Sequence, residues 1–460
     1  MKANRPTHAS VQWLLLMAVA SQASATTWKE KVLYSFQGGA NDGAYPAGGV
    51  VFDKTGNLYG ATTVWGPDNC FPIANECGLV FELSPPAKKG DPWIETILFQ
   101  FKGKGANDAS SPSGGVILDN AGNVYGVSAY GGTGDCVLLG TSAGCGTVYK
   151  LSPPAKKGDP WTETLLYSFK SGNDGYFPWG TLTFDAKGNL YGATQFGGSK
   201  GNTCNVFYGG NCGTVFELSP PKQKGGNWTE KVLHSFAGTP DGANPNGGAL
   251  VGRGGTLYGM TRTGGNQGCA GKDTSVGCGT VFELRPPAGN GGVWRERLLH
   301  VFTGGNDGAL PNSGLAPDGQ TGFYGTTGLG GTNDRGVVFQ LSNGRERYHE
   351  VVLYNFTGGA DGLDPGPLVV DRSGRPYGTT SGGGSKFGGT VFRLEKLLRH
   401  GWKLVILYTF KGVTQEDGAS PNAAVTFDRM GSSIFGTTQA GGTGQNCGQS
   451  GCGTVFKIWP

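Results

Sequence analysis

The hydrophobic residues of this chain fall into short runs that are separated by polar turns rich in glycine. The run Val-Leu-Tyr-Ser-Phe at residues 32–36 is rich in β-branched and aromatic side chains, which favour β-strands. The segment Asp-Lys-Thr-Gly-Asn at residues 53–57 has the composition of a tight turn between two such runs. The pattern therefore predicts a chain built from short β-strands.

Four motifs follow one another in a fixed order, and the set occurs seven times. The first motif, Trp-x-Glu-x-Val-Leu-Tyr-Ser-Phe at residues 28–36, begins again at residues 93, 161, 228, 294, 348 and 402. The other three motifs are Gly-Gly-x-x-x-Asp (48–53), Gly-Asn-Leu-Tyr-Gly (56–60) and Gly-Thr-Val-Phe (213–216). Such a recurrence indicates a repeat architecture.

Seven repeats of four strands predict an all-β fold, a seven-bladed β-propeller with four strands per blade, as a single domain over residues 26–460. A β-solenoid is the alternative, but its coils are usually shorter and it needs capping repeats at both ends. We expect the first motif to form the outermost strand of each blade. The N-terminal copy at residues 28–36 would then close the last blade beside residues 453–458 and hide both strand edges.

Aromatic residues recur at equivalent positions of the repeat, and we interpret them as core that fills the gaps between blades. One position carries Phe36, Phe101, Phe169, Phe236, Phe302, Phe356 and Phe410. Another position carries Tyr59, Tyr125, Tyr191, Tyr258, Tyr324 and Tyr377.

The first 25 residues have the pattern of a signal peptide. Lys2 and Arg5 make a basic start, residues 11–20 are almost entirely apolar, and Ala23-Ser24-Ala25 fits the small-x-small cleavage pattern. A membrane anchor is the alternative, but it needs about 20 apolar residues. We therefore predict cleavage after Ala25 and a soluble protein, secreted or periplasmic, that has no membrane span.

The ten cysteines form close pairs in sequence, separated by 5 to 9 residues. In an exported chain this arrangement predicts five local disulfides, because a zinc site would usually need denser Cys or Cys/His clusters. The predicted pairs are Cys70/Cys77, Cys136/Cys145, Cys204/Cys212, Cys269/Cys278 and Cys447/Cys452.

The composition excludes several classes of protein. Glycine is abundant, at 87 of 460 residues, but hydrophobic residues make up 37% and charged residues only 15%, which argues against a disordered chain. The glycine and proline content also disfavours a helical bundle. A formal net charge of +4 is too small to indicate a nucleic-acid-binding protein.

The motifs resemble the GloVer repeats of the choice-of-anchor family of exported bacterial proteins. The matching segments are Val-Leu-Tyr-Ser-Phe (32–36), Asp-Gly-x-x-Pro (42–46), Gly-Asn-Leu-Tyr-Gly-Ala-Thr (188–194) and Gly-Thr-Val-Phe-Glu-Leu-Ser-Pro (213–220). The resemblance covers nearly all of residues 28–460 and implies a propeller of the cell envelope or the medium. It implies no particular activity, and no functional residues carry over.

Two sets of loops are expected on one face of the propeller: the Asp-Gly loops between blades and the cysteine loops within them. Variable loops on a rigid scaffold often carry function, and exposed aromatic rings with nearby polar groups suit sugar rings. The same aromatic residues could instead pack the loops onto the blades. The candidate ligand-binding residues are Trp65, Tyr130, Phe196, Tyr45, Tyr176 and Trp179.

One aspartate per repeat lies in each Asp-Gly loop, and it can cap the turn or bind calcium. These residues are Asp42, Asp108, Asp174, Asp241, Asp307, Asp361 and Asp417. The loops lack the dense acidic pattern of a dedicated calcium site, so we predict no metal ion.

The histidines of the mature chain are His234, His300, His349 and His400, and all lie in or beside the outermost strand motif, with no metal-binding spacing. We therefore predict no catalytic residues and no cofactor. The expected function is a monomeric binding or structural propeller that recognises an envelope glycan or protein. The alternative is a polysaccharide- or ester-processing enzyme with carboxylates at the channel mouth of the same face.

Overall fold

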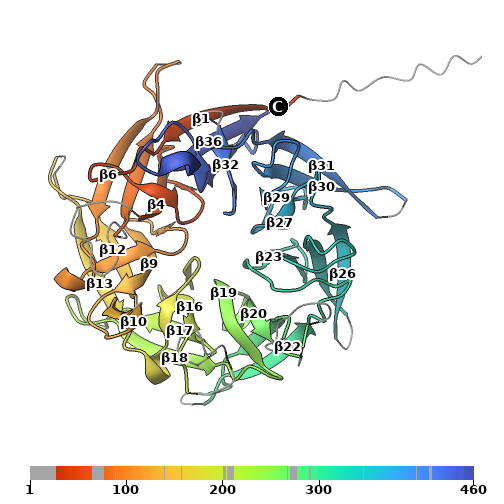
Figure 1. The fold of residues 1–460 in the computed structure, drawn as a ribbon. Helices are drawn as coiled ribbons and strands as arrows, with labels where there is room; N and C mark the ends of the chain where they lie inside the picture. Colours follow the sequence, from red (N-terminus) through yellow and green to blue (C-terminus); the bar gives the residue numbers. More distant parts are fainter. Residues whose placement is uncertain are drawn as a thin grey trace, which may run out of the picture.

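Seven antiparallel sheets of four or five strands stand around a central channel, with the chain running once around the ring (Figure 1). The computed structural model describes residues 27–64, 77–88, 90–138, 140–156, 158–199, 204, 212–266, 268–269, 277–289, 292–344, 347–399, 401–413 and 417–460. This architecture confirms the predicted all-β, seven-bladed propeller.

Every blade has the predicted order of layers, from the channel outwards. The outermost strands are β6 (Ile94–Gln100), β13 (Thr162–Ser168), β18 (Thr229–Ser235), β22 (Arg295–Val301), β26 (Tyr348–Asn355), β31 (Trp402–Thr409) and β1 (Lys29–Ser35). The third strands are β5 (Leu79–Ser84), β12 (Thr147–Ser152), β17 (Thr214–Ser219), β21 (Thr280–Arg285), β25 (Val337–Asn343), β30 (Thr390–Lys396) and β36 (Thr454–Trp459). The second strands are β4 (Leu58–Val64), β9 (Val124–Gly131), β16 (Leu190–Phe196), β20 (Leu257–Gly264), β24 (Phe323–Thr327), β29 (Pro376–Gly382) and β34 (Ile434–Thr438).

The innermost layer departs from one continuous strand, because it is interrupted or irregular in most blades. Its strands are β2 (Ala44–Pro46), β3 (Val51–Phe52), β7 (Ala109–Pro112), β8 (Ile117–Leu118), β14 (Tyr176–Pro178), β15 (Thr183–Phe184), β19 (Gly242–Val251), β23 (Ala316–Pro317), β27 (Leu363–Pro365), β28 (Val369–Val370), β32 (Gly418–Ala419) and β33 (Thr426–Phe427). The remaining elements are the short strands β10 (Val137–Leu138), β11 (Thr141–Ser142) and β35 (Ala440–Gly441) and the 3-10 turns η1 (Lys104–Ala106), η2 (Gly172–Asp174), η4 (Arg253–Gly255) and η5 (Gly448–Ser450).

Glycines of the innermost layer allow neighbouring blades to approach each other closely at the channel. Around the channel, the Gly-Gly segment of one blade touches the backbone of the next. A Cβ atom on Gly114 would lie 2.2 Å from the carbonyl oxygen of Gly180, and one on Gly247 would lie 2.2 Å from the nitrogen of Gly314. Only glycine permits this approach, so the repeated Gly-Gly motif sets how closely the blades meet at the channel.

The two ends of the described part of the chain pair with each other, as predicted. Strand β1 runs antiparallel to β36, from Lys29 opposite Trp459 to Ser35 opposite Thr454. The backbone N–H of Phe36 extends this ladder by donating to the Gly453 carbonyl at 3.1 Å. The last blade is therefore completed by the N-terminal strand, and the ring closes.

Pairs of aromatic rings fill the gap between adjacent blades. Phe169, which follows β13, packs edge-on against Phe216 of β17 in the next blade, at 5.1 Å between ring centroids. The other six junctions carry equivalent pairs, at 4.8 to 5.4 Å: Phe36–Phe81, Phe101–Tyr149, Phe236–Phe282, Phe302–Phe339, Phe356–Phe392 and Phe410–Phe456. These rings are fully buried, which confirms the core assignment of the phenylalanine position.

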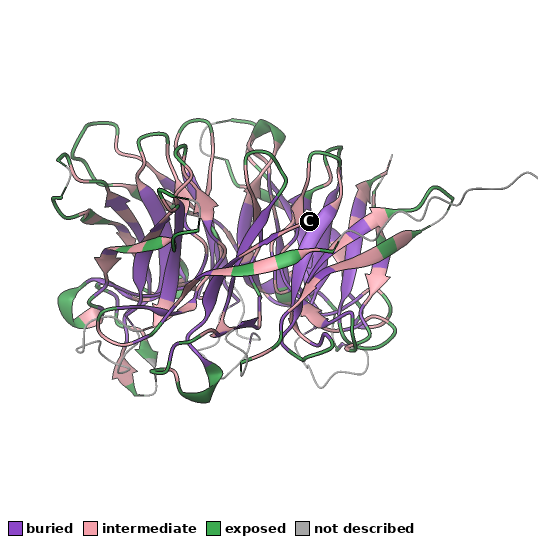
Figure 2. Ribbon diagram, turned by 90° about the horizontal axis from the view of Figure 1, so that it is seen from above, coloured by how far each residue is buried: buried purple, intermediate pink, exposed green. Residues whose placement is uncertain are grey.

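The repeated tyrosine position is also largely buried; only Tyr258 among the six is half-exposed. Burial is concentrated in the middle of the strands, whereas the loops on both faces of the ring are exposed (Figure 2). In the described part of the chain, no helix has the length and apolar character needed to cross a membrane.

Four predicted disulfides are present: Cys136–Cys145, Cys204–Cys212, Cys269–Cys278 and Cys447–Cys452. Cys70 of the fifth pair lies outside the described residues, as do His400, Trp65 and the predicted signal peptide at residues 1–25. The cleavage site after Ala25 stays a prediction.

Candidate functional site

The Asp-Gly loops and the cysteine loops meet on one face of the ring. On this face, the N–H of Tyr45 in β2 donates to the carbonyl of Cys452 in the preceding blade at 2.9 Å. The same bond recurs at every junction: Ser111 to Cys77, Phe177 to Cys145, Asn244 to Cys212, Leu310 to Cys278, Asp364 to Arg335 and Ser420 to Gly388. Each inner strand is thus fixed to the loop of its neighbour.

The donor residue of this bond has a left-handed backbone in all seven blades. The φ angle lies between 52° and 60° at Tyr45, Ser111, Phe177, Asn244, Leu310, Asp364 and Ser420. None of these residues is glycine, although this conformation costs a side-chain-bearing residue about 1 kcal/mol or more. The backbone is therefore the same in every blade, whereas the side chain differs almost every time.

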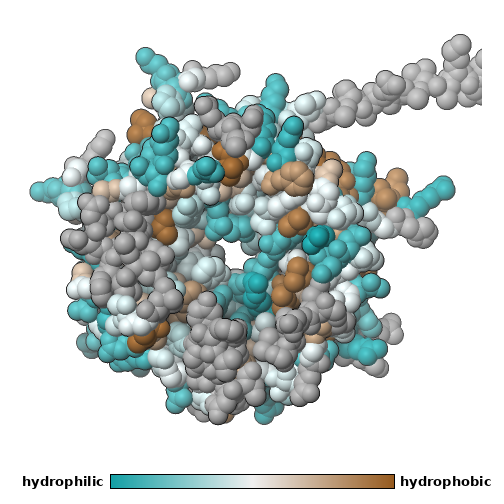
Figure 3. All heavy atoms as spheres, viewed as in Figure 1, coloured by the Kyte–Doolittle hydropathy of each residue, from teal (hydrophilic) through white to brown (hydrophobic). Residues whose placement is uncertain are grey.

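In each blade, the residue two positions after this donor lines a cavity of about 580 Å³ in the channel. The hollow is visible at the centre of the ring in the space-filling view (Figure 3). Most of its lining is glycine and small or polar residues; the larger side chains include Trp179, Asn246, Arg262, Asn312 and Asp364. A small molecule or one end of a longer ligand could enter this space.

An aromatic cluster forms one wall of the channel mouth. Phe177 stacks on Trp179, with the rings nearly parallel and 5.7 Å apart. Phe177 also packs against Tyr130 of the preceding blade, at 5.2 Å, and against Phe196, at 5.7 Å. Phe196 in turn contacts Tyr176 at 5.5 Å. Trp179 is 36% exposed and faces the cavity, whereas the four other rings are half-buried.

The structure brings together four of the six predicted ligand-binding residues: Tyr130, Tyr176, Trp179 and Phe196. Tyr45 lies on blade 1, where it is half-buried and packs against the core cluster that contains Phe36 and Cys452. Trp65 lies outside the described residues. Phe177, the centre of the cluster, was missed by sequence reasoning, although its place directly before a repeated proline matches that of Tyr45.

A polar wall lies across blades 4 to 6. Asp364 accepts hydrogen bonds from Asn312 Nδ2 at 2.7 Å and from Ser381 Oγ at 2.8 Å, so both of its carboxylate oxygens are engaged. Arg262, Asp364 and Arg335 also line an adjoining cavity of about 340 Å³. Both arginines are exposed. Sequence reasoning missed this wall because single polar residues in loops carry no motif.

The Asp-Gly aspartates lie at the outer side of the junctions and not at the channel mouth. Asp42 accepts the N–H of Gln37 at 2.7 Å and that of Gly43 at 2.6 Å. At the other junctions the aspartate accepts the N–H of Lys102, Lys170, Ala237, Thr303, Thr357 or Lys411. These bonds are what the turn-capping interpretation requires.

The aspartates also contact a side chain of the outermost strand. Tyr34, Tyr167, Tyr354 and Tyr408 donate their hydroxyl groups to the adjacent aspartates at 2.7 to 3.2 Å. Two junctions have histidine instead: His234 Nε2 lies 3.3 Å from Asp241, and His300 Nε2 lies 3.3 Å from Asp307. Both histidines are therefore on the outer strands, as their motif position predicts.

A glutamate from the next blade completes most of these junctions. Burial first, and then the charge of the neighbouring aspartate, raises the pKa of Glu95 to about 7, of Glu230 to about 8 and of Glu163 to about 9. The pKa values of Glu30 and Glu350 are likewise raised, to about 7. When the carboxyl groups of an aspartate and a glutamate lie close together and are shielded from water, both do not ionise easily, so the glutamate tends to keep its proton.

Comparison with known proteins identifies a repeat family. A model of the Gloeobacter/Verrucomicrobia repeat matches residues 72–271 and 268–460. Among curated proteins, none is similar enough to be matched to this chain.

Solved structures share the propeller fold at low similarity. A protein from Bacteroides uniformis, provisionally assigned as a 6-phosphogluconolactonase, is 14% identical over 78% of this chain and 84% of its own, with a TM-score of 0.46. A gluconolactonase from Xanthomonas campestris is 15% identical over 68% and 78%, with a TM-score of 0.37. The PQQ-bound aldose sugar dehydrogenase of Streptomyces coelicolor is 13% identical over 95% and 99%, with a TM-score of 0.40. Likenesses at this level carry no argument about activity.

Proposed function

The chain belongs to the Gloeobacter/Verrucomicrobia repeat family, and on this premise we propose that it is a binding propeller that holds a saccharide at the mouth of its central channel. The observation that supports this function is the stacked pair of Phe177 and Trp179, which presents a partly exposed indole ring to the cavity. A saccharide of the bacterial envelope is the ligand class that we propose.

The aromatic wall has the properties that a sugar ring requires. The apolar C–H face of a pyranose packs against an aromatic side chain. The aromatic side chain binds the sugar best when its own orientation is already fixed in the free protein. Phe177 lies parallel to Trp179 on one side and is itself held by Tyr130 and Phe196. The indole is therefore supported from behind, and its free face is the one that a ligand can cover.

Polar groups of the neighbouring blades supply the hydrogen bonds that would orient a saccharide. Asn246, Arg262 and Asn312 all line the same cavity as Trp179. Arg262 is exposed, and its guanidinium offers several donors in a fixed plane. An aromatic wall that faces such groups gives both contact area and selectivity for hydroxyl groups.

Export to the periplasm or the medium is part of this proposal. The predicted signal peptide motivates it, and four local disulfides suit an oxidising compartment. An envelope polysaccharide would be within reach of the protein in either place.

The alternative function, a polysaccharide- or ester-processing enzyme, has less support from the geometry. Glycoside hydrolysis generally uses two carboxyl groups about 5–10 Å apart. Among the described residues that line the channel cavity, Asp364 is the one acidic side chain, and Asn312 and Ser381 engage both of its oxygens. Binding is therefore the function that we put forward.

Retention on immobilised envelope polysaccharides tests the proposal, with indole fluorescence as the second readout. We expect the parent protein to be retained by at least one polysaccharide and Trp179→Ala to lose this retention. Arg262→Ala should weaken binding less, because it removes hydrogen bonds but leaves the stacking surface intact.

The matched control is Phe387→Ala, which removes an aromatic side chain that is 82% exposed and does not line the cavity. It should leave retention unchanged. Equal retention of Trp179→Ala and the parent would contradict the proposed site, and failure of the parent to bind any saccharide would contradict the proposed ligand class.

A further inference from the structure

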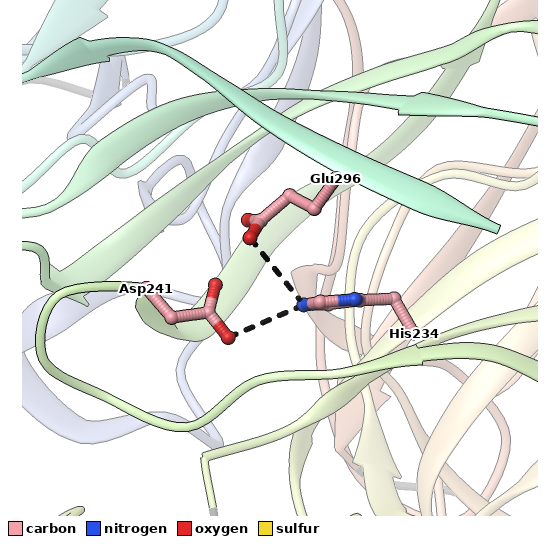
Figure 4. Close-up of side chains that lie close together, drawn as sticks. All are labelled: His234, Asp241 and Glu296. Atoms are coloured by element: carbon pink, nitrogen blue, oxygen red, sulfur yellow. Dashed lines mark hydrogen bonds and ion pairs between the residues drawn. The ribbon is translucent and has the colours of Figure 1, made fainter.

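A cluster of three titratable side chains lies on the outer side of the ring, at the junction between blades 3 and 4 (Figure 4). His234 comes from β18 of blade 3, Asp241 from the loop that leads into blade 4, and Glu296 from β22 of blade 4. In Figure 4 the three side chains point toward one another. The cluster is separate from the channel mouth and takes no part in the proposed saccharide site.

The geometry of this cluster is compact. His234 Nε2 lies 3.3 Å from Asp241 Oδ2 and 3.9 Å from Glu296 Oε2, and the three ligand atoms all lie within 4.8 Å of one another. The side chains are 10%, 14% and 17% exposed, so the cluster is largely shielded while water can still reach it. A contact of 3.3 Å is long for a charge-assisted hydrogen bond, which is usually 2.7–2.9 Å.

All but one of the equivalent junctions lack the imidazole nitrogen of this cluster. Four of them carry tyrosine at the position of His234, and the tyrosine hydroxyl donates to the aspartate. A neutral imidazole instead offers a nitrogen lone pair, and histidine is the commonest protein ligand of metal ions. The acidic pair is thus a feature of the repeat, whereas the imidazole is specific to this junction and to the one at His300.

The His300 junction is similar in sequence but is arranged differently. His300 also lies 3.3 Å from its aspartate, yet the other oxygen of Asp307 accepts the hydroxyl of Thr303 at 2.6 Å. Residue 237, which matches Thr303 in the repeat, is alanine. Within the described part of the chain, the cluster at His234 is the one whose three ligand atoms converge.

The local charge also favours a cation at the first cluster. At other junctions Lys102, Lys170 or Lys411 acts on the carboxyl groups, but the corresponding residue here is Ala237. The lysine found at this position in three other junctions is thus replaced here by an uncharged side chain.

We propose that His234, Asp241 and Glu296 bind one divalent transition-metal ion, of the class of Zn²⁺, which ties blade 3 to blade 4. One imidazole nitrogen and two carboxylate oxygens are ligands that zinc accepts at about 2.0–2.2 Å, and water can fill a fourth tetrahedral position. Calcium prefers six to eight oxygen ligands, which this cluster does not offer. The site departs from our expectation, based on the sequence, that the chain binds no metal.

Calorimetric titration of the untagged, chelator-treated full chain with zinc sulfate at pH 7.5 tests the proposal, together with elemental analysis of the dialysed protein. We expect one zinc ion per chain and a melting temperature that rises with zinc, because a ligand of the folded state stabilises it. Calcium chloride should give neither effect.

His234→Tyr is the informative variant, because tyrosine already occupies this position at four other junctions and the fold should tolerate it. Zinc affinity should fall by more than the about 10- to 100-fold that loss of an outer-shell partner causes. His300→Tyr is the matched control and should bind zinc as the parent does.

Three results would overturn the assignment: no zinc uptake by the parent, equal uptake by His234→Tyr, or a loss in His300→Tyr that is absent in His234→Tyr. The first result would leave the cluster as a polar contact between the two blades, without a metal ion.

Discussion

At the outer side of the ring the repeat preserves its side chains, whereas at the channel mouth it preserves only its backbone. Each outer junction has an aspartate that accepts a backbone N–H group. Four of the junctions have a tyrosine hydroxyl beside this aspartate, and most have a glutamate from the next blade. Each mouth position has the same φ angle and the same bond to the preceding blade, but its side chains include tyrosine, phenylalanine, leucine and aspartate.

This difference separates structural residues from candidate functional ones. A side chain that recurs in every blade has the same role in each of them, and the role common to all blades is to hold adjacent blades together. A side chain that varies on an unchanged backbone is not needed for holding the blades together. The exposed Trp179 and Arg262 belong to the second group, which is why we assign the binding site to the channel mouth.

The largest expected effect comes from breaking an inter-blade aromatic pair. Phe216→Ala removes a fully buried ring that packs against Phe169, and its cavity should cost about 3–5 kcal/mol of unfolding free energy. Denaturant-induced unfolding measures this loss. Trp179→Ala is the control from the mouth and should cost less than about 1 kcal/mol. Equal losses in the two variants would remove the distinction between the two regions.

A smaller effect is expected from pH, through the carboxyl pairs of the junctions. Glu163 has a raised pKa of about 9, so between its unfolded value of 4.5 and about 9 the folded chain holds a proton that the unfolded chain releases. This contribution to stability is complete below about pH 4.5 and is lost as the pH rises through about 9. We expect the melting temperature to fall between pH 6 and pH 9.5.

Glu163→Gln sharpens this prediction, because glutamine can still donate to Asp108 but carries no charge. The variant should lose less stability than the parent over the same pH range, by on the order of 2 kcal/mol. A parallel pH dependence of the two proteins would show that the junction carboxyl pair does not retain its proton.

The smallest stability change is expected at the one aromatic pair that departs from the repeat. Tyr149 is fully buried, and its hydroxyl has no hydrogen-bond partner among the described residues. Tyr149→Phe restores the residue that the other six junctions carry, so it should stabilise the fold by about 1–2 kcal/mol. Thermal unfolding of the parent and the variant measures this change. A lower melting temperature of the variant would contradict the prediction and would mean that the Tyr149 hydroxyl stabilises the fold.

The sequence predicted the fold well because each propeller motif is local and is repeated. The strand motifs and four disulfides follow from short spacings, and the closure of β1 on β36 follows from the order of the motifs at the two ends of the chain; the structure confirms them. The core role of the phenylalanine position followed from its recurrence. Four of the predicted ligand-binding residues, which depart from the repeat within one sector, lie together in the structure, and their role in binding stays a prediction.

The sequence by itself thus determined the blades, their number and how the ring closes. Only the tertiary structure decided which side chains converge, because convergence depends on loops from different blades meeting over the channel. Phe177 meets Tyr130 across a blade boundary, and Arg262 lines the same cavity as Asp364, about a hundred residues away in the chain. The cluster of His234, Asp241 and Glu296 has the same origin, because its three side chains come from two blades and the loop between them and converge only when both blades are in place.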